Sequence, residues 1–335
     1  MRVLLLRDKK PGHYHQVEAV GRMLAGMGAA VDRVDIRPVW FGHGDILKLA
    51  VNRLPISPRG LLERLYRLDP DRLQGPDLVV GSGRPTIAAG VFLKQVTGAR
   101  FVYIGRISGY RTAHVDRQLV QNPREAHDRG CVLSPLPSLV RRDDLPLPRR
   151  LLAPADLSGA TLGLLVGGPA HGHVFEDADW HDLERLVRGL AALGVRWQAT
   201  ASRRTPAVAA ARLARLAAEG VVAHFIDPRV SGPGTAGPLF AADALVVAED
   251  SQSMIAEGLA AGRPVVALKP RLVASSSANE VIASWVVAGG LSVVPLSADV
   301  GHLAAVLTST GIAPDPQPVL RRILSEMLAD FALTP

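Results

Sequence analysis

The chain has 335 residues, of which 48% are apolar and 21% charged, a balance that excludes an extensively disordered protein. This length exceeds what one hydrophobic core usually serves, so we expect two domains. The single cysteine, Cys131, excludes an internal disulfide, and no CxxC or His/Cys spacing predicts a zinc site.

The net charge of +7 is unevenly distributed along the chain. Residues 1–150 carry 25 Lys and Arg against 14 Asp and Glu, whereas residues 151–335 carry 13 against 17. The basic half favours an anionic partner, either a phospholipid surface or a phosphorylated substrate. Nucleic acid is not expected, because only 4% of the residues are aromatic and no basic-aromatic stacking pattern appears. Apolar runs are too short for a signal peptide or a bilayer span, which predicts a cytoplasmic protein that can at most lie on the inner face of the membrane.

In the N-terminal half, short apolar runs alternate with helical patterns, as is typical of parallel sheets with crossover helices. Strands are predicted at Val3–Leu6, Val31–Ile36, Leu78–Val80 and Phe101–Ile104. A helix should follow the first strand, where apolar residues recur at helical spacing, namely Val17, Val20, Leu24 and Met27. Pro85 favours another helix start just after Gly83.

A stretch rich in proline and charge, residues 133–155, predicts the linker between the two halves. Beyond it, strands are predicted at Thr161–Val166, Arg196–Ala199, Val221–Phe225, Ala244–Val247 and Val265–Leu268. The chain closes with a helical pattern over Val319–Phe331. We therefore predict a Rossmann-like domain at residues 1–150, a second one at 151–315, and a C-terminal helix at 316–335.

The residues directly after each strand are the candidates for a site, because ligands of open α/β sheets bind at the carboxyl ends of the strands. After the first strand lie Asp8, Lys10, Gly12, His13 and Gln16. A histidine there could act as general base towards an acceptor hydroxyl, because histidine titrates near neutral pH. The alternative is a histidine at a helix start with no chemical role. Ser82, Gly83 and Arg84 follow the third strand, where Arg84 could hold an anionic group.

The segment AEDSQSMIAEGLAAGRPV, residues 248–265, runs from a strand into a helix and on to the next strand. Asp250 or Ser251 would cap this helix, and helical spacing places Asp250, Ser253 and Glu257 on one face. Amides and serine hydroxyls at the helix start suit a diphosphate, while Glu257 could accept hydrogen bonds from ribose hydroxyls. A capped helix with a solvated glutamate is the alternative.

Two further loops of the C-terminal half carry candidate phosphate ligands, Thr200, Ser202, Arg203 and Arg204 in one and Gly167 and Gly168 in the other. Guanidinium groups beside hydroxyls offer the forked donors that phosphate oxygens prefer, although a solvated arginine pair is the alternative. The two glycines would let the backbone approach a ligand closely, but GGPAHG matches neither a Walker loop nor GxGxxG.

A basic amphipathic stretch covers residues 46–68, where apolar residues are mixed with Arg53, Arg59, Arg64 and Arg67. Such a stretch could rest on anionic lipid. Ordinary packing with a solvated basic face is the alternative.

Four segments, DKKPGHYHQ, GSGRPT, TASRRTP and EDSQSMIAEGLAAGRPV in this order, resemble the mitochondrial-fission elongated-mitochondria family, whose bacterial members are described as glycosyltransferases. The resemblance spans nearly the whole chain and implies an α/β fold of GT-B type, with two facing Rossmann-like domains, parallel sheets and an interdomain cleft. It further implies that the C-terminal helix can cross back to the first domain. The C-terminal domain would bind a nucleotide-sugar donor and the N-terminal domain the acceptor, without a metal or a resident cofactor.

Carried over by position, the resemblance assigns ribose recognition to Glu257 and the phosphates to Ser202, Arg203, Ser251 and Ser253. His13 would be the base, with Asp8 and Lys10 as further catalytic candidates. We therefore predict a metal-independent glycosyltransferase with a lipid-linked or other envelope-associated acceptor. Two alternatives stay open, because a fold does not fix an activity. One is a non-catalytic scaffold that docks on a membrane or a partner, and the other is an epimerase or hydrolase of the nucleotide sugar.

Overall fold

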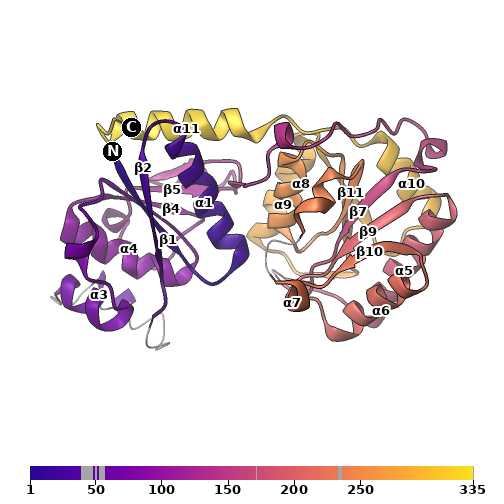
Figure 1. The fold of residues 1–335 in the computed structure, drawn as a ribbon, viewed down its shortest axis with the longest axis horizontal. Coiled ribbons are helices and arrows are strands. Elements are labelled where there is room, and N and C mark those ends of the chain that lie inside the picture. Colours follow the sequence, from indigo (N-terminus) through magenta and orange to yellow (C-terminus); the bar gives the residue numbers. More distant parts are fainter. Residues whose placement is uncertain (39–47, 50, 53–56, 171, 233–235, 335) are drawn as a thin grey trace. The chain divides into compact units, whose positions relative to one another are not determined.

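The computed structural model describes residues 1–38, 48–49, 51–52, 57–170, 172–232 and 236–334 (Figure 1). The chain forms two compact units, one of Met1–Leu139 with Gln317–Pro335 and the other of Val140–Pro316. The second unit thus begins before the predicted boundary at residue 150. The reason is that Arg142 donates to the carbonyls of Leu259 and Ala313, and the Arg149 amide to the carboxylate of Asp243.

A six-stranded parallel sheet forms the centre of the first unit, in the order β2-β1-β3-β4-β5-β6. Its strands are β1 (Arg2–Arg7), β2 (Ala30–Asp35), β3 (Leu78–Ser82), β4 (Arg100–Ile104), β5 (Arg117–Val120) and β6 (Cys131–Leu133). The first four occupy the predicted segments. The sequence patterns do not predict β5 and β6, because these strands are short and β6 is only partly buried. The strand order switches direction between β1 and β3, which is where ligands of such sheets bind.

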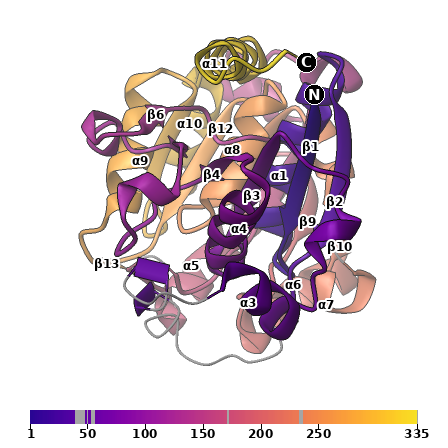
Figure 2. The same cartoon turned by 90° about the vertical axis from the view of Figure 1, so that its left-hand side faces the viewer.

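Helices cover both faces of this sheet (Figures 1 and 2). On one face lie α1 (Pro11–Ala25) and α11 (Pro316–Asp330), whose buried residues share a core with Val3 and Leu5 of β1. On the other face lie α3 (Pro58–Tyr66) and α4 (Arg84–Thr97), packed on Leu4 and Leu6. The C-terminal helix therefore returns to the first unit, although it follows the second unit in sequence.

The second unit repeats the plan with another six-stranded parallel sheet, in the order β10-β9-β7-β11-β12-β14. Its strands are β7 (Thr161–Leu165), β9 (Arg196–Thr200), β10 (Val222–Ile226), β11 (Ala244–Ala248), β12 (Val265–Lys269) and β14 (Leu291–Pro295). All except β14 lie at predicted segments. A small antiparallel sheet pairs β8 (His173–Val174) with β13 (Leu272–Val273). Here the order switches between β7 and β11.

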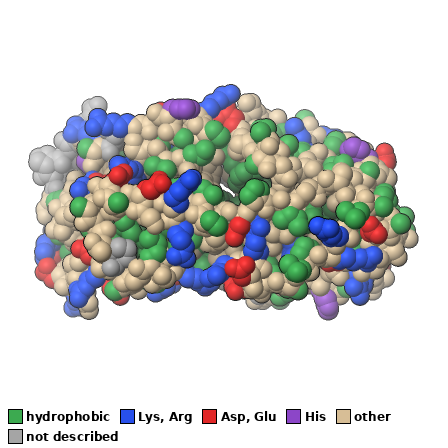
Figure 3. Space-filling view, turned by 90° about the horizontal axis from the view of Figure 1, so that it is seen from above, with side chains coloured by type: hydrophobic (Ala, Val, Ile, Leu, Met, Phe, Trp, Pro, Cys, Tyr) green, Lys and Arg blue, Asp and Glu red, His purple; other side chains and the backbone are tan. Residues whose placement is uncertain are grey.

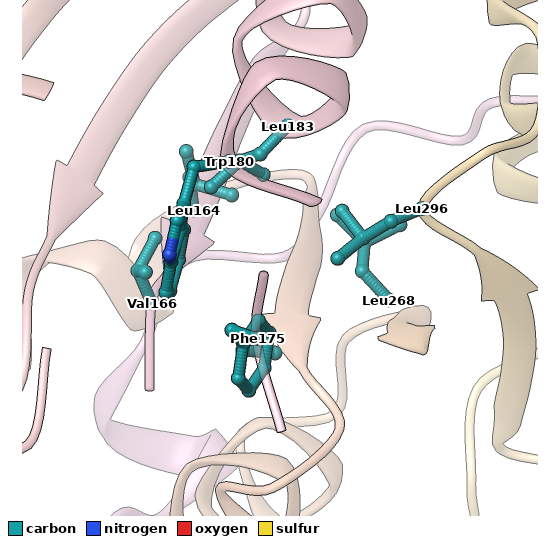
Figure 4. Close-up of a pocket in the computed structure, with 8 residues that line it drawn as sticks. Leu164, Val166, Phe175, Trp180, Leu183, Leu268 and Leu296 are labelled. Carbon is teal, nitrogen blue, oxygen red and sulfur yellow. The ribbon is translucent and has the colours of Figure 1, made fainter. Parts of the chain in front are cut away.

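Helices α5 (Asp177–Ala192), α6 (Ala207–Ala218) and α10 (Val300–Ser309) cover one face of the second sheet. The other face carries α8 (Gln252–Ala260) and α9 (Ser277–Val287), and a short helix α7 (Pro228–Ser231) follows β10. Under α5 lies a small apolar pocket, lined by Leu164, Leu268 and the rings of Phe175 and Trp180, which stack 4.8 Å apart (Figure 4). Its lining belongs to the hydrophobic core, so it is no candidate for a nucleotide.

Two parallel sheets with helices on both faces confirm the predicted α/β class and its Rossmann-like halves. The interdomain cleft stays a prediction. Within the described residues, no helix is both long and apolar enough to cross a bilayer.

The predicted basic amphipathic stretch lies partly outside the described residues, Arg53 included. In its described part, α3 buries Leu62 and Tyr66, and Arg59 forms an ion pair with Asp71. Figure 3 shows Lys and Arg side chains interspersed with Asp and Glu on the face that it presents. Membrane binding through the basic half stays a prediction.

Candidate functional site

The turn from β1 to α1 brings Asp8 and His13 together. The Oδ2 atom of Asp8 lies 2.6 Å from Nδ1 of His13. The Asp8 side chain is only 3% exposed, whereas that of His13 is 34% exposed. A buried carboxylate on Nδ1 orients the ring and leaves Nε2 as the nitrogen that can take up a proton. The pair therefore has the geometry of a general base with its orienting acid.

The other oxygen of Asp8 is held by the backbone. The Lys10 amide donates to Oδ1 of Asp8 at 2.9 Å, and the Lys10 side chain points into solvent. Lys10 thus contributes its amide to this arrangement, and its ammonium group does not join the Asp8–His13 pair. Gly12 lies beside His13 in the first turn of α1, half-buried.

Gly83 is the position that admits the Asp8–His13 pair. It precedes α4 with a φ of +86°, a left-handed conformation that favours glycine. A Cβ atom here would lie 2.3 Å from Oδ2 of Asp8 and 2.3 Å from Nδ1 of His13. The sequence singles out Gly83 as a binding residue, and the structure shows that its lack of a side chain makes room for the two side chains.

Ser82 and Gln16 form a hydrogen bond at the same edge of the sheet. The buried Ser82 hydroxyl lies 3.0 Å from Oε1 of Gln16, which ties α1 to the end of β3. The two side chains contact each other, and their role as ligands stays a prediction. Arg84, by contrast, is exposed at the first position of α4.

Tyr103 also lies at this edge, and the sequence gives no indication of it. Burial raises the pKa of the Tyr103 hydroxyl, and a backbone hydrogen bond with Gly83 opposes that rise. Tyr103 is only 5% exposed. Its place beside Gly83 follows from the pairing of β4 with β3, which the sequence does not predict.

In the second unit, α8 begins at Gln252 with Ser251 at its N-cap, and no side chain caps it. The helical face predicted for three residues holds for Ser253 and Glu257, which are both half-buried. It does not hold for Asp250, which precedes the helix and turns inward. Its buried carboxylate accepts from the Gly168 amide at 3.1 Å and from Nη2 of Arg204 at 2.6 Å.

Gly167 and Gly168, which follow β7, lie in close contact with other residues of the protein. A Cβ atom on Gly167 would lie 2.1 Å from Oδ1 of Asp250, and one on Gly168 would lie 2.2 Å from the Arg204 carbonyl oxygen. The sequence predicts a close approach of a ligand to both glycines, and that approach stays a prediction. In the structure, however, the approach is to Asp250 and Arg204, and the Gly168 amide is already used.

The loop after β9 uses its hydroxyl groups internally. Thr200 is buried with its hydroxyl on the carbonyls of Ala201 and Ile226, and the Ser202 hydroxyl accepts from the Arg204 amide. These two predicted phosphate ligands are therefore engaged in shaping the loop. Arg203 is exposed.

Arg204 lies across the loops after β9 and β11. Its side chain is 44% exposed, and Nη2 contacts both Asp250 and the Ser251 hydroxyl. Burial raises the pKa of Asp250 despite the opposing hydrogen bond and charge of Arg204. The guanidinium group is thereby held beside the uncapped start of α8.

A second buried pair, absent from the sequence-based candidates, joins His173 to Glu249 through a 3.1 Å contact. Burial alone would lower the pKa of His173, but the hydrogen bond and charge of Glu249 outweigh it and the pKa is raised. No group of three or more His, Cys, Asp or Glu within the part of the chain that the structure describes could hold a metal ion.

Comparison with known proteins agrees with this architecture. The family model described as mitochondrial fission ELM1 matches residues 11–284, and the chain belongs to that family. A comparison with curated protein sequences gave no match.

Solved structures of the same fold are similar over almost the whole chain. The complex of S. aureus MnaA with UDP has a TM-score of 0.62 at 11% identity, covering 99% of this chain and 97% of that one. The UDP-GlcNAc 2-epimerase of Methanocaldococcus jannaschii, with UDP-GlcNAc and UDP, has 0.53 at 12%, covering 98% and 100%. The glycotransferase of kitacinnamycin has 0.52 at 17%, covering 99% and 96%. The fold is therefore that of GT-B glycosyltransferases and epimerases.

Proposed function

We propose that the chain is a glycosyltransferase that moves a sugar from a nucleotide-sugar donor to an acceptor hydroxyl. The Asp8–His13 pair is the observation that carries this proposal. It lies at the carboxyl edge of the first sheet, beside the β1/β3 switch point, with its acid buried and its base half-exposed. An acceptor bound there would meet a base already oriented for proton removal.

In the proposed reaction, Nε2 of His13 takes the proton of the acceptor hydroxyl while the oxygen attacks the anomeric carbon of the sugar. The bond from that carbon to the diphosphate oxygen breaks, and the nucleoside diphosphate leaves with the bonding electrons. Asp8 stabilises the imidazolium that forms. A single displacement of this kind inverts the configuration of the anomeric carbon.

The donor is assigned to the second unit, at the edge where α8 begins. The amides at its uncapped start and the guanidinium group of Arg204 would stabilise the leaving diphosphate, as helix N-termini and arginines do elsewhere. Ser253 would contact the phosphates, and Glu257 the ribose. Arg203 supplies a second exposed cation next to Arg204. We expect no divalent metal to be required.

An epimerase or hydrolase of the nucleotide sugar is the second candidate. It is supported by the likeness to a UDP-GlcNAc 2-epimerase, whose fold is shared over 98% of this chain and 100% of that one. Incubation with a nucleotide sugar in the absence of any acceptor separates the two candidates. Free sugar formed at the rate of nucleotide release, or an epimeric nucleotide sugar formed without net release of nucleotide, would favour the second candidate over transfer.

Turnover of a panel of UDP- and other nucleotide sugars, with candidate acceptors, tests the proposal directly. His13→Ala should bind the donor normally and lose about a hundredfold or more in turnover, because general bases typically contribute that much. His15→Gln, on the same helix, is the matched control and should keep full activity. Wild-type turnover in the His13 variant would remove the base from the mechanism.

A further inference from the structure

The side chain of His173 has a hydrogen-bond acceptor at each ring nitrogen. Its Nδ1 lies 3.1 Å from the carbonyl oxygen of Ala170, and its Nε2 lies 3.1 Å from Oε2 of Glu249. Both side chains are buried, with 1% of His173 and 5% of Glu249 exposed. Solvent therefore does not satisfy either nitrogen in place of these partners.

This geometry fixes the number of protons on the pair. A carbonyl oxygen only accepts, so Nδ1 carries a hydrogen. An ionised carboxylate also only accepts, so the contact between Nε2 and Oε2 needs a second proton, on either the ring or the acid. Without that proton the carboxylate of Glu249 would be a buried charge facing a lone pair, which is costly. The raised pKa of His173 agrees with this count.

The pair joins loops that carry the proposed donor site. His173 lies in β8, which pairs with β13 directly beyond β12, and the stacked Phe175 and Trp180 anchor the same segment (Figure 4). Glu249 directly follows β11 and precedes Asp250, which accepts from Gly168 and Arg204. The loops after β7, β9 and β11 are thus connected through two ion pairs, and the pairing of β8 with β13 adds the loop after β12.

The charges of these two ion pairs are balanced only while the proton is present. His173 and Arg204 then oppose Glu249 and Asp250, whereas loss of the proton leaves the two pairs with one net negative charge beside the start of α8. One oxygen of Asp250, Oδ1, is buried and has no hydrogen-bond partner within the described residues. Of the other charged groups nearby, Arg271, between β12 and β13, is paired with Asp179 and Asp182 of α5.

We propose that His173 and Glu249 are positioning residues for the nucleoside diphosphate. The proton that these two residues share keeps the two ion pairs neutral, so that an anion can bind at α8. The inference rests on the proposed function, because it takes the donor to bind at that helix. The pair is buried and does not contact the substrate. It acts through the loop that carries Asp250 and Ser251.

Two conservative variants represent the two states of the pair. In Glu249→Gln, a neutral His173 keeps its hydrogen bond to Ala170 and accepts a second one from the new amide group. The charges of Arg204 and Asp250 then balance each other without the shared proton. In His173→Gln, the amide donates to an ionised Glu249, so the edge keeps its extra negative charge. His181→Gln changes an exposed histidine that pairs with Asp177 on α5 of the same unit, and is the control.

Calorimetric titration of the full chain with UDP from pH 6.5 to 9.5 tests the proposal. Wild type and the His181 variant should lose about tenfold in affinity as the pair gives up its proton, the size expected for one nearby charge. Glu249→Gln should keep the low-pH affinity throughout, and His173→Gln should show the weaker affinity throughout. The diphosphate of UDP also titrates, but it does so in the same way with all four proteins. Its contribution therefore cancels when their affinities are compared at each pH.

The same titration distinguishes a failure of the shared proton from a failure of the donor site. If wild type binds UDP at pH 6.5 but both pair variants follow its pH dependence, the shared proton is not coupled to the ligand and the inference is overturned. If wild type binds neither UDP nor any other nucleoside diphosphate, the donor assignment and this inference both fall. Should one variant not fold, as judged by circular dichroism, the flat profile expected of the other decides the outcome.

Discussion

Three residues from two separate segments of the chain define the proposed base, and each is needed for a different physical reason. In the proposed reaction, Asp8 orients the ring and His13 accepts the proton, and Gly83 leaves the space in which both side chains fit. The sequence indicates the first two because polar residues crowd a strand-to-helix turn. That Gly83 adjoins them depends on β3 pairing with β1, which no local pattern contains.

Gly83→Ala should impair turnover far more than its loss of stability explains. The new Cβ atom would overlap Asp8 and His13 and force them apart, so we expect a fall of about a hundredfold in turnover. Gly98→Ala is a matched control, because its φ of +76° imposes a similar backbone strain with nothing within 4 Å. Each should cost about 1–3 kcal/mol of unfolding free energy by denaturant titration. Equal turnover in the two variants would contradict the role of Gly83.

The His173–Glu249 pair should also make stability depend on pH. Its folded-state pKa is raised, so its contribution is fully present below the unfolded pKa of histidine and is lost as the pH rises through the folded value. Wild type should therefore lose unfolding free energy on the alkaline side of about pH 6.5, by about 1.4 kcal/mol for each unit by which the pKa is raised. Glu249→Gln should flatten this dependence in urea titrations between pH 6 and 9, and an unchanged slope would show that the pair carries no such proton.

At the scale of elements, the strands that alternate clearly with helices could be predicted from the sequence, whereas β5, β6 and β14 could not. Buried parallel strands such as β1 and β11 are continuous apolar runs, but β6 has three residues and β14 is only partly buried. The direction in which side chains point is the second feature that could not be predicted from the sequence. The hydroxyl groups of Thr200 and Ser202 follow a strand, as expected of ligands, yet they bond to backbone groups of their own loop and of the neighbouring strand β10, because the backbone there needs partners.

Helix α8 provides the element-scale test of donor binding. Glu257→Ala should abolish detectable binding of the nucleotide sugar while circular dichroism shows an intact fold. The reason is that the alanine side chain cannot accept the hydrogen bonds that the ribose hydroxyls donate to the carboxylate. Glu326→Ala on α11 removes an exposed glutamate and should leave affinity unchanged. Affinity that is unaltered in the Glu257 variant for every nucleotide sugar tested would defeat the assignment of that residue.

Helix α11 should be required for the stability of the first unit. Leu324 is fully buried among residues of β1, β3 and α1, so Leu324→Ala should cost about 2–5 kcal/mol of unfolding free energy. Val319→Ala, at a position that is 39% exposed on the same helix, should cost well under half as much. Denaturant titration of the full chain measures both, and equal costs would mean that the helix does not contribute to the core.

At the scale of the whole molecule, the same plan occurs twice. Each unit has a parallel sheet whose strand order switches once, and each switch point carries a buried acid next to a cationic or ionisable partner, Asp8 with His13 and Asp250 with Arg204. This repetition agrees with membership of a family whose fold is shared by glycosyltransferases and epimerases. In the proposed function, the proton transfer belongs to the first unit and the diphosphate to the second.

Thermal unfolding of the wild-type chain with a panel of nucleoside diphosphates and their sugars tests the central claim most directly. A ligand that binds only the native state stabilises it by about 2.7 kcal/mol at a hundred times its dissociation constant, which raises the melting temperature measurably. We predict such a rise for at least one nucleoside diphosphate in wild type and none in the Glu257→Ala variant. An unchanged melting temperature with every nucleotide of the panel would contradict the account.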